Sequence, residues 1–231
     1  MSKTKKLSIS TTHEETVWGW IYLFLYLLIL PLLVQTGNRL LAAPLSDAAL
    51  NFLFYSINFI SVCIIFRKFL KKSLVFLKLR FGYTLQSALF GFVLYNIGTI
   101  ALSFLLQRLY PGFGNVNDGY ITAMTAENYS LMAIGTVFLV PVAEEVLFRG
   151  LLFQGLYNRS RAAAYIVSAL AFCAIHIKNY VGTYDPLLLL LCFIQYIPAG
   201  LALAWAYARA DTVAAPILIH MSINALGVAV R

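Results

Sequence analysis

The sequence predicts an all-α protein, a polytopic membrane helix bundle of about seven transmembrane helices. Two observations predict this class. Hydrophobic residues make up 61% of the 231 residues and charged residues only 11%, whereas soluble domains carry roughly 25% charged residues. Seven long apolar runs also follow one another along the chain. The composition excludes a disordered chain and an ordinary cytosolic enzyme, because too few charges remain to cover a water-facing surface.

The apolar runs define the expected spans in chain order. They cover residues 17–34, 48–66, 83–106, 129–153, 162–177, 186–208 and 212–230. Most are close to the ~20 residues that cross a bilayer. The first run is expected to remain as an uncleaved helix, because it is long for a signal sequence and further spans follow. Residues 1–231 are therefore expected to form a single integral-membrane domain.

Lys and Arg are distributed unevenly over the segments that join these spans. If the N-terminus is cytoplasmic, twelve of the 17 Lys and Arg residues fall on the cytoplasmic side and four on the other. The positive-inside rule therefore predicts a cytoplasmic N-terminus and an external C-terminus. The excess of positive charge indicates contact with anionic lipid headgroups, and we expect no nucleic acid as a partner.

The segment RKFLKKSLVFLKLRF, residues 67–81, interleaves basic and apolar positions. One interpretation is an amphipathic helix that lies in the membrane plane against anionic lipid. The other is a short basic loop that only fixes the orientation of the chain. The sequence does not decide between them, and neither implies catalysis.

Two adjacent acidic residues, Glu144 and Glu145, lie deep in the fourth apolar run. Placing a charge inside a span costs at least ~2.5–3.5 kcal/mol. Arg149 follows Glu145 at i+4 spacing, so these two can form a structural ion pair. Adjacent residues on a helix point about 100° apart, so one arginine cannot easily serve both carboxylates. We therefore expect Glu144 to have a functional role.

Two histidines also lie within the apolar runs. His176 ends the fifth run and His220 lies in the seventh. Either histidine alone would be more typical of a packed core residue than of a catalytic one. Here, however, His220 and Asn224 share one helix face at i, i+4 spacing, and so do Phe172 and His176. If these two helix faces meet Glu144, they place two imidazoles, a carboxamide and an aromatic ring beside its carboxylate.

Three prolines interrupt the backbone hydrogen bonding of these spans. Pro141 lies in the fourth run, Pro198 in the sixth, and Pro216 in the seventh, four residues before His220. We expect Pro216 to bend the seventh helix and to free the Thr212 carbonyl.

The expected depths of the two histidines disagree. At ~1.5 Å per residue, His220 lies ~13 Å from Asp211 and His176 lies ~21 Å from Ala162, although both starting points belong to the same membrane face. The two rings can meet only if the fifth helix starts deeper or tilts, or if the turn at residues 159–161 dips inward.

Together these residues form the inventory of a water-activating amide hydrolase. A carboxylate beside an imidazole can deprotonate a water molecule. A second imidazole and a carboxamide can donate hydrogen bonds to the oxyanion of a tetrahedral intermediate. The sequence contains no HExxH motif, no GxSxG motif and no pair of intramembrane aspartates, which other intramembrane protease chemistries require.

The segments EEVLFR (144–149), FCAIH (172–176) and HMSIN (220–224) resemble, in order, the EExxxR, FxxxH and HxxxN motifs of a known family. This is the CPBP family, the CAAX protease and bacteriocin-processing (Abi) intramembrane proteases. It includes the type II CAAX prenyl endopeptidase and many bacteriocin self-immunity proteins. The resemblance covers residues 141–224 as the catalytic core and implies an active site within the helix bundle.

The resemblance implies a role for each matching residue. Glu144 would be the general base that activates water, with help from His176, while His220 and Asn224 would form the oxyanion site. The supporting residues would be Glu145, Arg149 and Phe172. The family pattern favours a metal-free mechanism without a cofactor. The alternative is a zinc ion held by Glu144, His176 and His220.

The resemblance therefore implies an intramembrane endopeptidase. The small size of the chain and the absence of an organelle-targeting segment favour a bacterial cell membrane as its location. The substrates would be membrane-bound or amphipathic peptides, such as bacteriocin or pheromone precursors, cleaved near the cytoplasmic face. One alternative within the family is bacteriocin self-immunity. An alternative outside it is a proton-coupled transporter or scaffold, since intramembrane Glu, Arg and His also build proton relays. The oligomeric state does not follow from the sequence.

Overall fold

The computed structural model describes residues 7–230, and every regular element in this range is a helix. This confirms the all-α class. Lys3, Lys5, Lys6 and Arg231, which entered the count of charges on the two sides, lie outside the described residues.

Six helical stretches within residues 7–230 are long and apolar enough to cross a membrane. They are His13–Arg39, Asp47–Ile65, Phe81–Leu109, Tyr129–Tyr157, Arg161–Tyr180 and Pro186–Ala210. A shorter apolar helix, α13 (Ala214–Ala229), follows them. These seven elements correspond in order to the seven predicted runs, and their ends differ from the predicted ends by at most five residues. The chain is a multi-pass membrane protein.

Two of the stretches are single helices, α3 (Asp47–Ile65) and α5 (Phe81–Leu109), and the others are composite. The first joins α1 (His13–Phe24), a π-helical turn (Leu25–Ile29) and α2 (Leu30–Arg39). The fourth joins α7 (Tyr129–Ile134), a π-helical turn (Gly135–Leu139), α8 (Val140–Glu145), a second π-helical segment (Val146–Phe153) and α9 (Gln154–Tyr157). The fifth joins α10 (Arg161–Ile177) to a 3₁₀ turn (Lys178–Tyr180), and the sixth joins α11 (Pro186–Gln195) to α12 (Ile197–Ala210).

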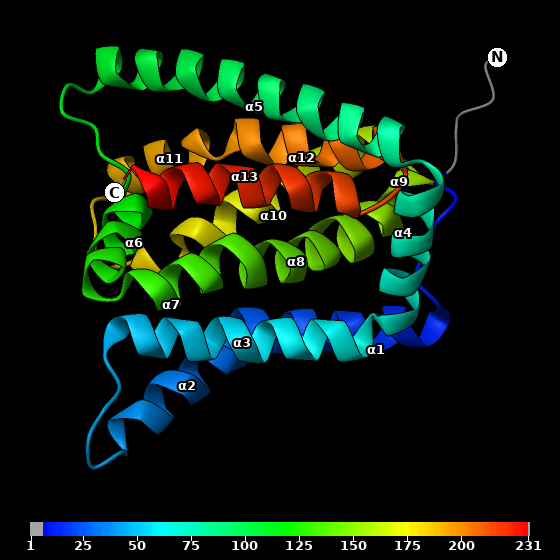
Figure 1. Ribbon diagram of the computed structural model, residues 1–231. Helices are drawn as coiled ribbons and strands as arrows, with labels where there is room; N and C mark the ends of the chain where they lie inside the picture. Colours follow the sequence, from blue (N-terminus) through cyan, green and yellow to red (C-terminus); the bar gives the residue numbers. More distant parts are fainter. Residues whose placement is uncertain (1–6, 231) are drawn as a thin grey trace.

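Two further helices lie across the ends of the bundle, as Figure 1 shows: α4 (Arg67–Leu79) at one end and α6 (Val116–Glu127) at the other. For residues 67–81 the structure supports the helix and excludes the loop. Phe69 and Ser73 of α4 are buried while its basic residues stay exposed, as expected for a helix at a membrane surface. The sequence analysis did not predict α6, because its polar composition resembles a loop.

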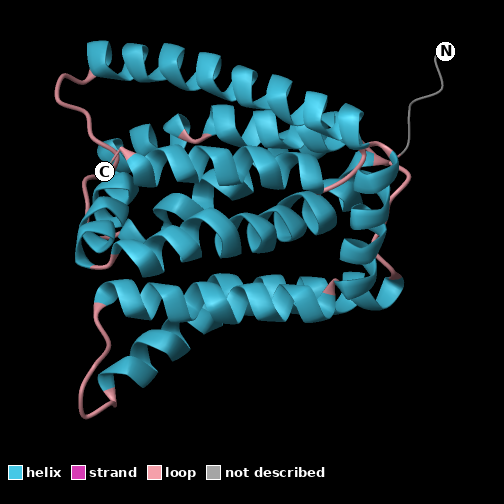
Figure 2. Cartoon of the chain, in the orientation of Figure 1, coloured by secondary structure: helices cyan, strands magenta, loops and turns pink. Residues whose placement is uncertain are grey.

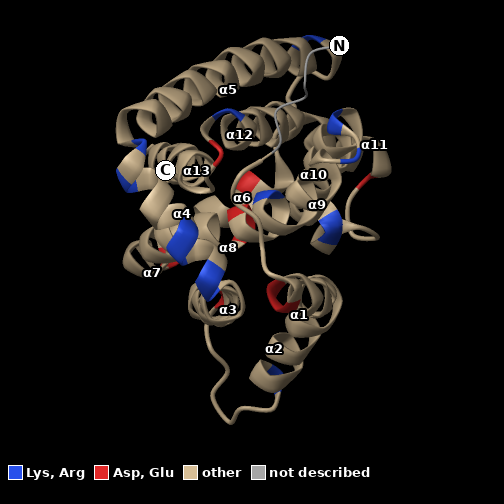
Figure 3. Ribbon diagram, turned by 90° about the vertical axis from the view of Figure 1, so that its right-hand side faces the viewer, with Lys and Arg blue, Asp and Glu red and all other residues tan. Residues whose placement is uncertain are grey.

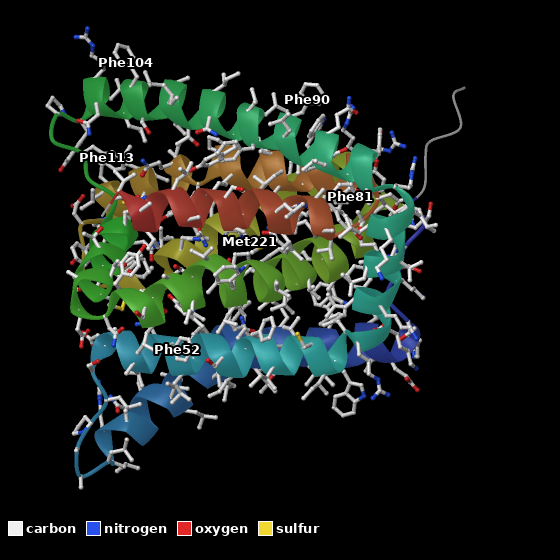
Figure 4. All side chains as sticks on the ribbon, viewed as in Figure 1. Phe52, Phe81, Phe90, Phe104, Phe113 and Met221 are labelled. Atoms are coloured by element: carbon white, nitrogen blue, oxygen red, sulfur yellow. The ribbon has the colours of Figure 1, made fainter. Side chains whose placement is uncertain are left out.

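The stretch Tyr129–Tyr157 forms the centre of the bundle. The buried share of its apolar window is 61%, against 11% for α5. In Figure 1, α8 lies between a layer containing α1 and α3 and a layer containing α12 and α13, and α5 covers the outside. Phe90 and Phe104 of α5 point away from the bundle in Figure 4, and 48% and 66% of their surfaces are exposed. Apolar side chains thus face lipid, while buried polar groups gather around the central stretch.

Lys and Arg residues collect at the end of the bundle where α4 lies, which faces the viewer in Figure 3. The described chain begins at this end and finishes near the opposite end (Figure 1). Short loops join the helices at both ends (Figure 2). Opposite ends for the two termini are what an odd number of crossings requires.

The turn between α12 and α13 is covered by two other segments. Asp211 ends α12 in the left-handed conformation, with φ of 58°, which Asp tolerates better than most residues. Its carboxylate accepts the Ser8 N–H at 2.9 and 3.0 Å. Thr212 donates its hydroxyl to the Ser73 carbonyl of α4 at 3.2 Å. The N-terminal segment (residues 7–12) and α4 therefore close over the start of α13.

This cover corrects the prediction about the depth of the fifth helix and the prediction of a bend at Pro216. Residues 211–213 are buried, whereas residues 158–161 are exposed. The expectation that the fifth helix starts deeper, or that its preceding turn dips inward, is wrong, because α13 is the helix that begins inside the bundle. Pro216 is the third residue of α13, where a helix has no acceptor for an N–H. The expected bend at Pro216 is therefore also wrong.

Candidate active site

The central stretch is irregular where it passes the predicted site. The Val140 N–H donates to the Gly135 carbonyl, five residues earlier. In this register the Thr136 carbonyl would be served by residue 141, but Pro141 has no N–H. The side-chain amide of Asn224 on α13 donates to the Thr136 carbonyl instead, at 2.7 Å. The proline thus explains how Asn224 is held in place.

Glu144 points into the bundle from α8, and only 7% of it is exposed. Its Oε1 accepts a hydrogen bond from the Tyr26 hydroxyl at 3.3 Å. Tyr26 belongs to the π-helical turn of the first span and stacks on Phe54 of α3, with ring centroids 5.7 Å apart. Glu144 Oε2 is buried and has no hydrogen-bond partner among the described residues. One oxygen is therefore held by the protein and the other remains available for a reacting group.

Glu145 points in a different direction and binds two groups through one oxygen. Its Oε1 accepts from Arg149 Nη1 at 3.1 Å and from His220 Nδ1 at 2.9 Å. The Glu145 side chain is fully buried, as is that of Arg149. The prediction that Arg149 pairs with Glu145 and leaves Glu144 without a cation is confirmed in the geometry. The contact between Glu145 and His220 was not predicted.

Phe172 of α10 lies at the centre of this cluster. The guanidinium carbon of Arg149 stands 4.6 Å from the centroid of its ring. The rings of His176 and His220 lie with their centroids 4.7 and 5.7 Å from that of Phe172. Arg149 also donates from Nη2 to the Gly200 carbonyl of α12 at 3.2 Å. Phe172 and Arg149 therefore connect three helices around the two histidines.

His176 is oriented from both sides. Its Nδ1 lies 2.8 Å from the Phe172 carbonyl, and because a carbonyl oxygen only accepts, Nδ1 carries the hydrogen. The neutral ring then presents a lone pair on Nε2. Tyr196, the residue between α11 and α12, stacks on the His176 ring, with centroids 4.1 Å apart and planes 28° apart.

The structure thus connects five of the seven predicted residues by direct contacts: Glu145, Arg149, Phe172, His176 and His220. Glu144 is held separately by Tyr26, and Asn224 is attached through the backbone of the same central stretch. Within residues 7–230, Glu144 forms no hydrogen bond with either histidine. A water molecule or a substrate carbonyl is therefore needed to connect the carboxylate to the rings.

The donor geometry bears on the alternative of a zinc ion. No group of three or more His, Cys, Asp or Glu side chains in the described part of the chain is arranged to hold a metal ion. In both histidines Nδ1 is already used, by the Phe172 carbonyl in one case and by Glu145 in the other. Each ring keeps Nε2 for another partner, and zinc-bound histidines commonly donate their second N–H to a carbonyl or a carboxylate in this way.

Sequence reasoning missed Tyr26, Tyr196 and the Thr136 carbonyl. Tyr22 and Tyr26 stand one helical turn apart in a run otherwise made of aliphatic and aromatic residues, and this pair of hydroxyls was an available signal. Tyr196 directly precedes a helix whose second residue is Pro198, which marks a break. The role of the Thr136 carbonyl depends on a π-helical turn, and no side chain in the sequence predicts that turn.

Residues 126–226 match a family described as Rce1-like, Type II CAAX prenyl endopeptidase Rce1-like. The matched region contains all the predicted site residues, from Glu144 to Asn224. No curated protein matches the chain, and no solved structure does. Over residues 126–226 the chain is thus similar to the CAAX-type intramembrane proteases, as a CPBP family member is expected to be.

Proposed function

We propose that the chain is an intramembrane endopeptidase in which Glu144 activates the attacking water. The observation that carries this proposal is the state of its carboxylate. Tyr26 holds Oε1, whereas Oε2 is buried without a partner among residues 7–230. A buried acceptor left unpaired destabilises a fold by about 1–3 kcal/mol. Glu145 Oε2 is also unpaired, but Glu145 is neutralised by Arg149. Glu144 has no ion pair with a residue in 7–230, which favours a reacting role for it over a structural one.

The two histidines are arranged for different tasks. With hydrogen on Nδ1, His176 offers Nε2 as an acceptor that can hold and orient a water molecule. His220 donates from Nε2 only when both ring nitrogens carry hydrogen. The Glu145 carboxylate, 2.9 Å from Nδ1, is the counter-charge for that form. This supports His176 as the partner of the base and His220 as an oxyanion donor.

Asn224 can act as the second oxyanion donor. Its amide nitrogen has two hydrogens, and one of them is committed to the Thr136 carbonyl. The fixed hydrogen bond orients the amide plane and leaves the other hydrogen for a substrate oxygen. Preorganised donors of this kind account for much of the acceleration in acyl transfer.

The reaction then follows in two steps. Glu144 takes a proton from water as the water oxygen attacks the carbonyl carbon of the peptide, and the carbonyl oxygen becomes an oxyanion that His220 and Asn224 stabilise. The carbon–nitrogen bond then breaks, and the proton held by Glu144 passes to the leaving amine. Arg149 and Phe172 support the site by fixing Glu145 and the histidine rings.

The proposed mechanism is metal-free. It is tested by exposing the active protein to a strong chelator and then adding zinc. We expect the rate of cleavage to stay unchanged through both steps. Loss of activity on chelation, followed by recovery with zinc, would overturn the metal-free assignment.

We further propose that the protein lies in a bacterial cell membrane with its N-terminus in the cytoplasm and its C-terminus outside. The basic residues gathered around α4 support this orientation. The substrates would be membrane-bound or amphipathic peptides, such as bacteriocin or pheromone precursors, cleaved near the cytoplasmic face. Bacteriocin self-immunity is the second candidate function, and a proton-coupled transporter or scaffold is a third that the same buried charges support less well.

Replacement of Glu144 by Gln tests the proposed chemistry. Wild-type protein in phospholipid vesicles is incubated in H₂¹⁸O with a pool of synthetic amphipathic peptides, and new termini are detected by mass spectrometry. We expect ¹⁸O in the new carboxyl termini with the wild type, and bound but uncut peptides with Glu144→Gln. Glu14→Gln, a change of an exposed carboxylate, is the matched control and should cleave normally. Undiminished cleavage by Glu144→Gln would show that the mechanism is wrong.

A further inference from the structure

A groove opens at the end of the bundle, away from the Glu144 cluster. It has a volume of about 560 Å³ and lies between α4 and the N-terminal segment, residues 7–12. One wall is formed by a face of α4, and the other includes Ile9, which is itself buried. This volume lies within the range of small-molecule sites, roughly 300–1,000 Å³. We refer to it as the α4 groove.

The α4 wall is divided between charge and hydrocarbon. Its lining residues are Lys68, Lys71, Lys72, Val75 and Phe76, which recur at the spacing of a single helix face. The three lysines occupy the first half of this face, and the two apolar residues follow them. A ligand that fits both halves carries an anionic group at one end and an apolar chain at the other.

The lysines are poorly compensated by the protein itself. Residues 67–80 hold six basic residues and no acidic one. Lys68 pairs with the exposed Glu14 at 3.2 Å, and Lys72 reaches only a backbone carbonyl, that of Ser10, at 3.5 Å. Lys71 has no ion pair or hydrogen bond with a described residue.

The N-terminus of α4 has an anionic partner within the protein. The lysines lie in the first two turns of α4, where the dipole is positive and favours anions. The nearby Glu15 carboxylate is already used, because it accepts the N–H groups of Phe69 and Thr12 at 2.7 and 2.8 Å. The end of the helix is therefore already served by Glu15, and an external anion would be attracted by the lysine side chains.

We propose that the α4 groove binds one anionic phospholipid of the membrane leaflet. Its phosphate would be held by Lys68, Lys71 and Lys72, and one acyl chain would lie along Val75 and Phe76. The apolar half of the groove favours a lipid over a free phosphate ion. Leu79 continues the same face of α4 beyond Phe76, and with 75% of its surface exposed it can contact the hydrocarbon of the leaflet.

The proposal differs from diffuse attraction of a basic helix to a charged surface, and matched variants of α4 separate the two. The protein is equilibrated with phosphatidylglycerol or phosphatidylcholine, and the lipids that stay bound are counted by native mass spectrometry. We expect selective retention of phosphatidylglycerol by the wild type. The double variant Lys71→Gln, Lys72→Gln should lower that retention about tenfold or more.

The control pair Lys78→Gln, Arg80→Gln removes the same charge from residues that do not line the groove, and we expect it to retain the lipid. Equal losses in the two pairs would show diffuse attraction and overturn the proposal. Equal retention of the two lipids by the wild type would overturn it as well. Displacement of the lipid by millimolar inorganic phosphate would show that an anion alone occupies the lysines.

The apolar half of the groove has its own test. Val75→Trp fills the wall beside the proposed acyl chain, whereas Leu74→Trp adds the same ring to an exposed position outside the lining. We expect Val75→Trp alone to weaken retention of phosphatidylglycerol. Unaltered retention in Val75→Trp would contradict an acyl chain in the groove. Neither outcome depends on cleavage of a peptide, so the test stands apart from the proposed function.

Discussion

The hydroxyl of Tyr26 donates a hydrogen bond to Glu144 Oε1 across 3.3 Å, which ties the first membrane span to the carboxylate at the centre of the bundle. Tyr26 lies within the π-helical turn Leu25–Ile29. Glu144 lies in α8, between the π-helical segments Gly135–Leu139 and Val146–Phe153. Such turns recur at functional sites because they redirect side chains out of the regular helical pattern. The bond leaves Glu144 Oε2 as the oxygen that can take up a proton.

Replacement of Tyr26 by Phe should lower the turnover number more than it changes the KM. A hydrogen bond to a charged group contributes about 1.5–3 kcal/mol, so we expect kcat to fall by about tenfold to a hundredfold. The measurement is the steady-state rate of peptide cleavage in vesicles. Tyr22→Phe is the control, since this tyrosine is one turn away and donates to Asn58 instead of Glu144, at 3.0 Å. Equal losses in the two variants would show that Tyr26 acts only on stability.

Glu145→Gln should destabilise the fold as well as the site. The substitution leaves the fully buried Arg149 without its carboxylate, and breaking a buried pair in this way costs about 3–5 kcal/mol. We expect a large fall in the Tm of the protein in detergent. The double variant Glu145→Leu, Arg149→Met should recover much of this loss, because replacing both partners by apolar residues is often neutral.

The same double variant separates stability from positioning. It still lacks the oxygen that accepts from His220 Nδ1, so peptide cleavage should remain low although the Tm recovers. A double variant that regained both stability and activity would contradict the positioning role of Glu145.

Asn224→Ala should lower kcat strongly, while it lowers the free energy of unfolding only moderately. Loss of one oxyanion donor lowers kcat by about 10²–10³-fold, whereas an unpaired Thr136 carbonyl would reduce stability by about 1–3 kcal/mol. The checks are kcat and Tm for the variant beside Ser222→Ala, which removes another polar group from α13, one that bonds only to its own helix at Leu218. An Asn224→Ala enzyme with normal kcat would exclude this residue from the oxyanion site.

Much of the fold follows from the hydropathy of the chain, because seven apolar runs leave few ways to satisfy backbone polar groups in lipid. The pairing of Glu145 with Arg149 also follows from spacing within one helix. The contacts made by Tyr26, Tyr196 and His220 do not, because they join different helices. Spacing within a run carries no information on which face of the next helix it will meet.

The depth of α13 shows the same limit. An estimate from residue counts assumes that every helix begins at the membrane surface. Asp211 and Thr212 are instead bound by Ser8 and Ser73, which lie in the N-terminal segment and in α4. The sequence does not predict that the N-terminal segment or α4 belongs to the bundle. Because both pack over the turn at Asp211 and Thr212, α13 and its His220 lie further inside.

Gly200→Ala should disturb the site from a position that bears no functional group. An added Cβ at Gly200 would lie 2.9 Å from the Cα and 3.0 Å from the Cβ of Ala169 on α10. Because the first of these atoms is backbone, α10 and α12 must move apart. That movement would shift Phe172 and weaken the bond from Arg149 to the Gly200 carbonyl. We expect a lower Tm and slower cleavage. Overpacking of this kind typically lowers the free energy of unfolding by about 1–3 kcal/mol.

The control for Gly200→Ala is Gly227→Ala. Gly227 also lies within a helix, but its added Cβ would meet no atom within 4 Å. Replacing a glycine inside a helix by alanine favours the helix by about 1 kcal/mol, so this variant should match or exceed the wild-type Tm and cleave normally. If Gly200→Ala behaved in the same way, α10 and α12 would not be in close contact at this point, and Arg149 would need another anchor to hold Phe172 between the two histidines.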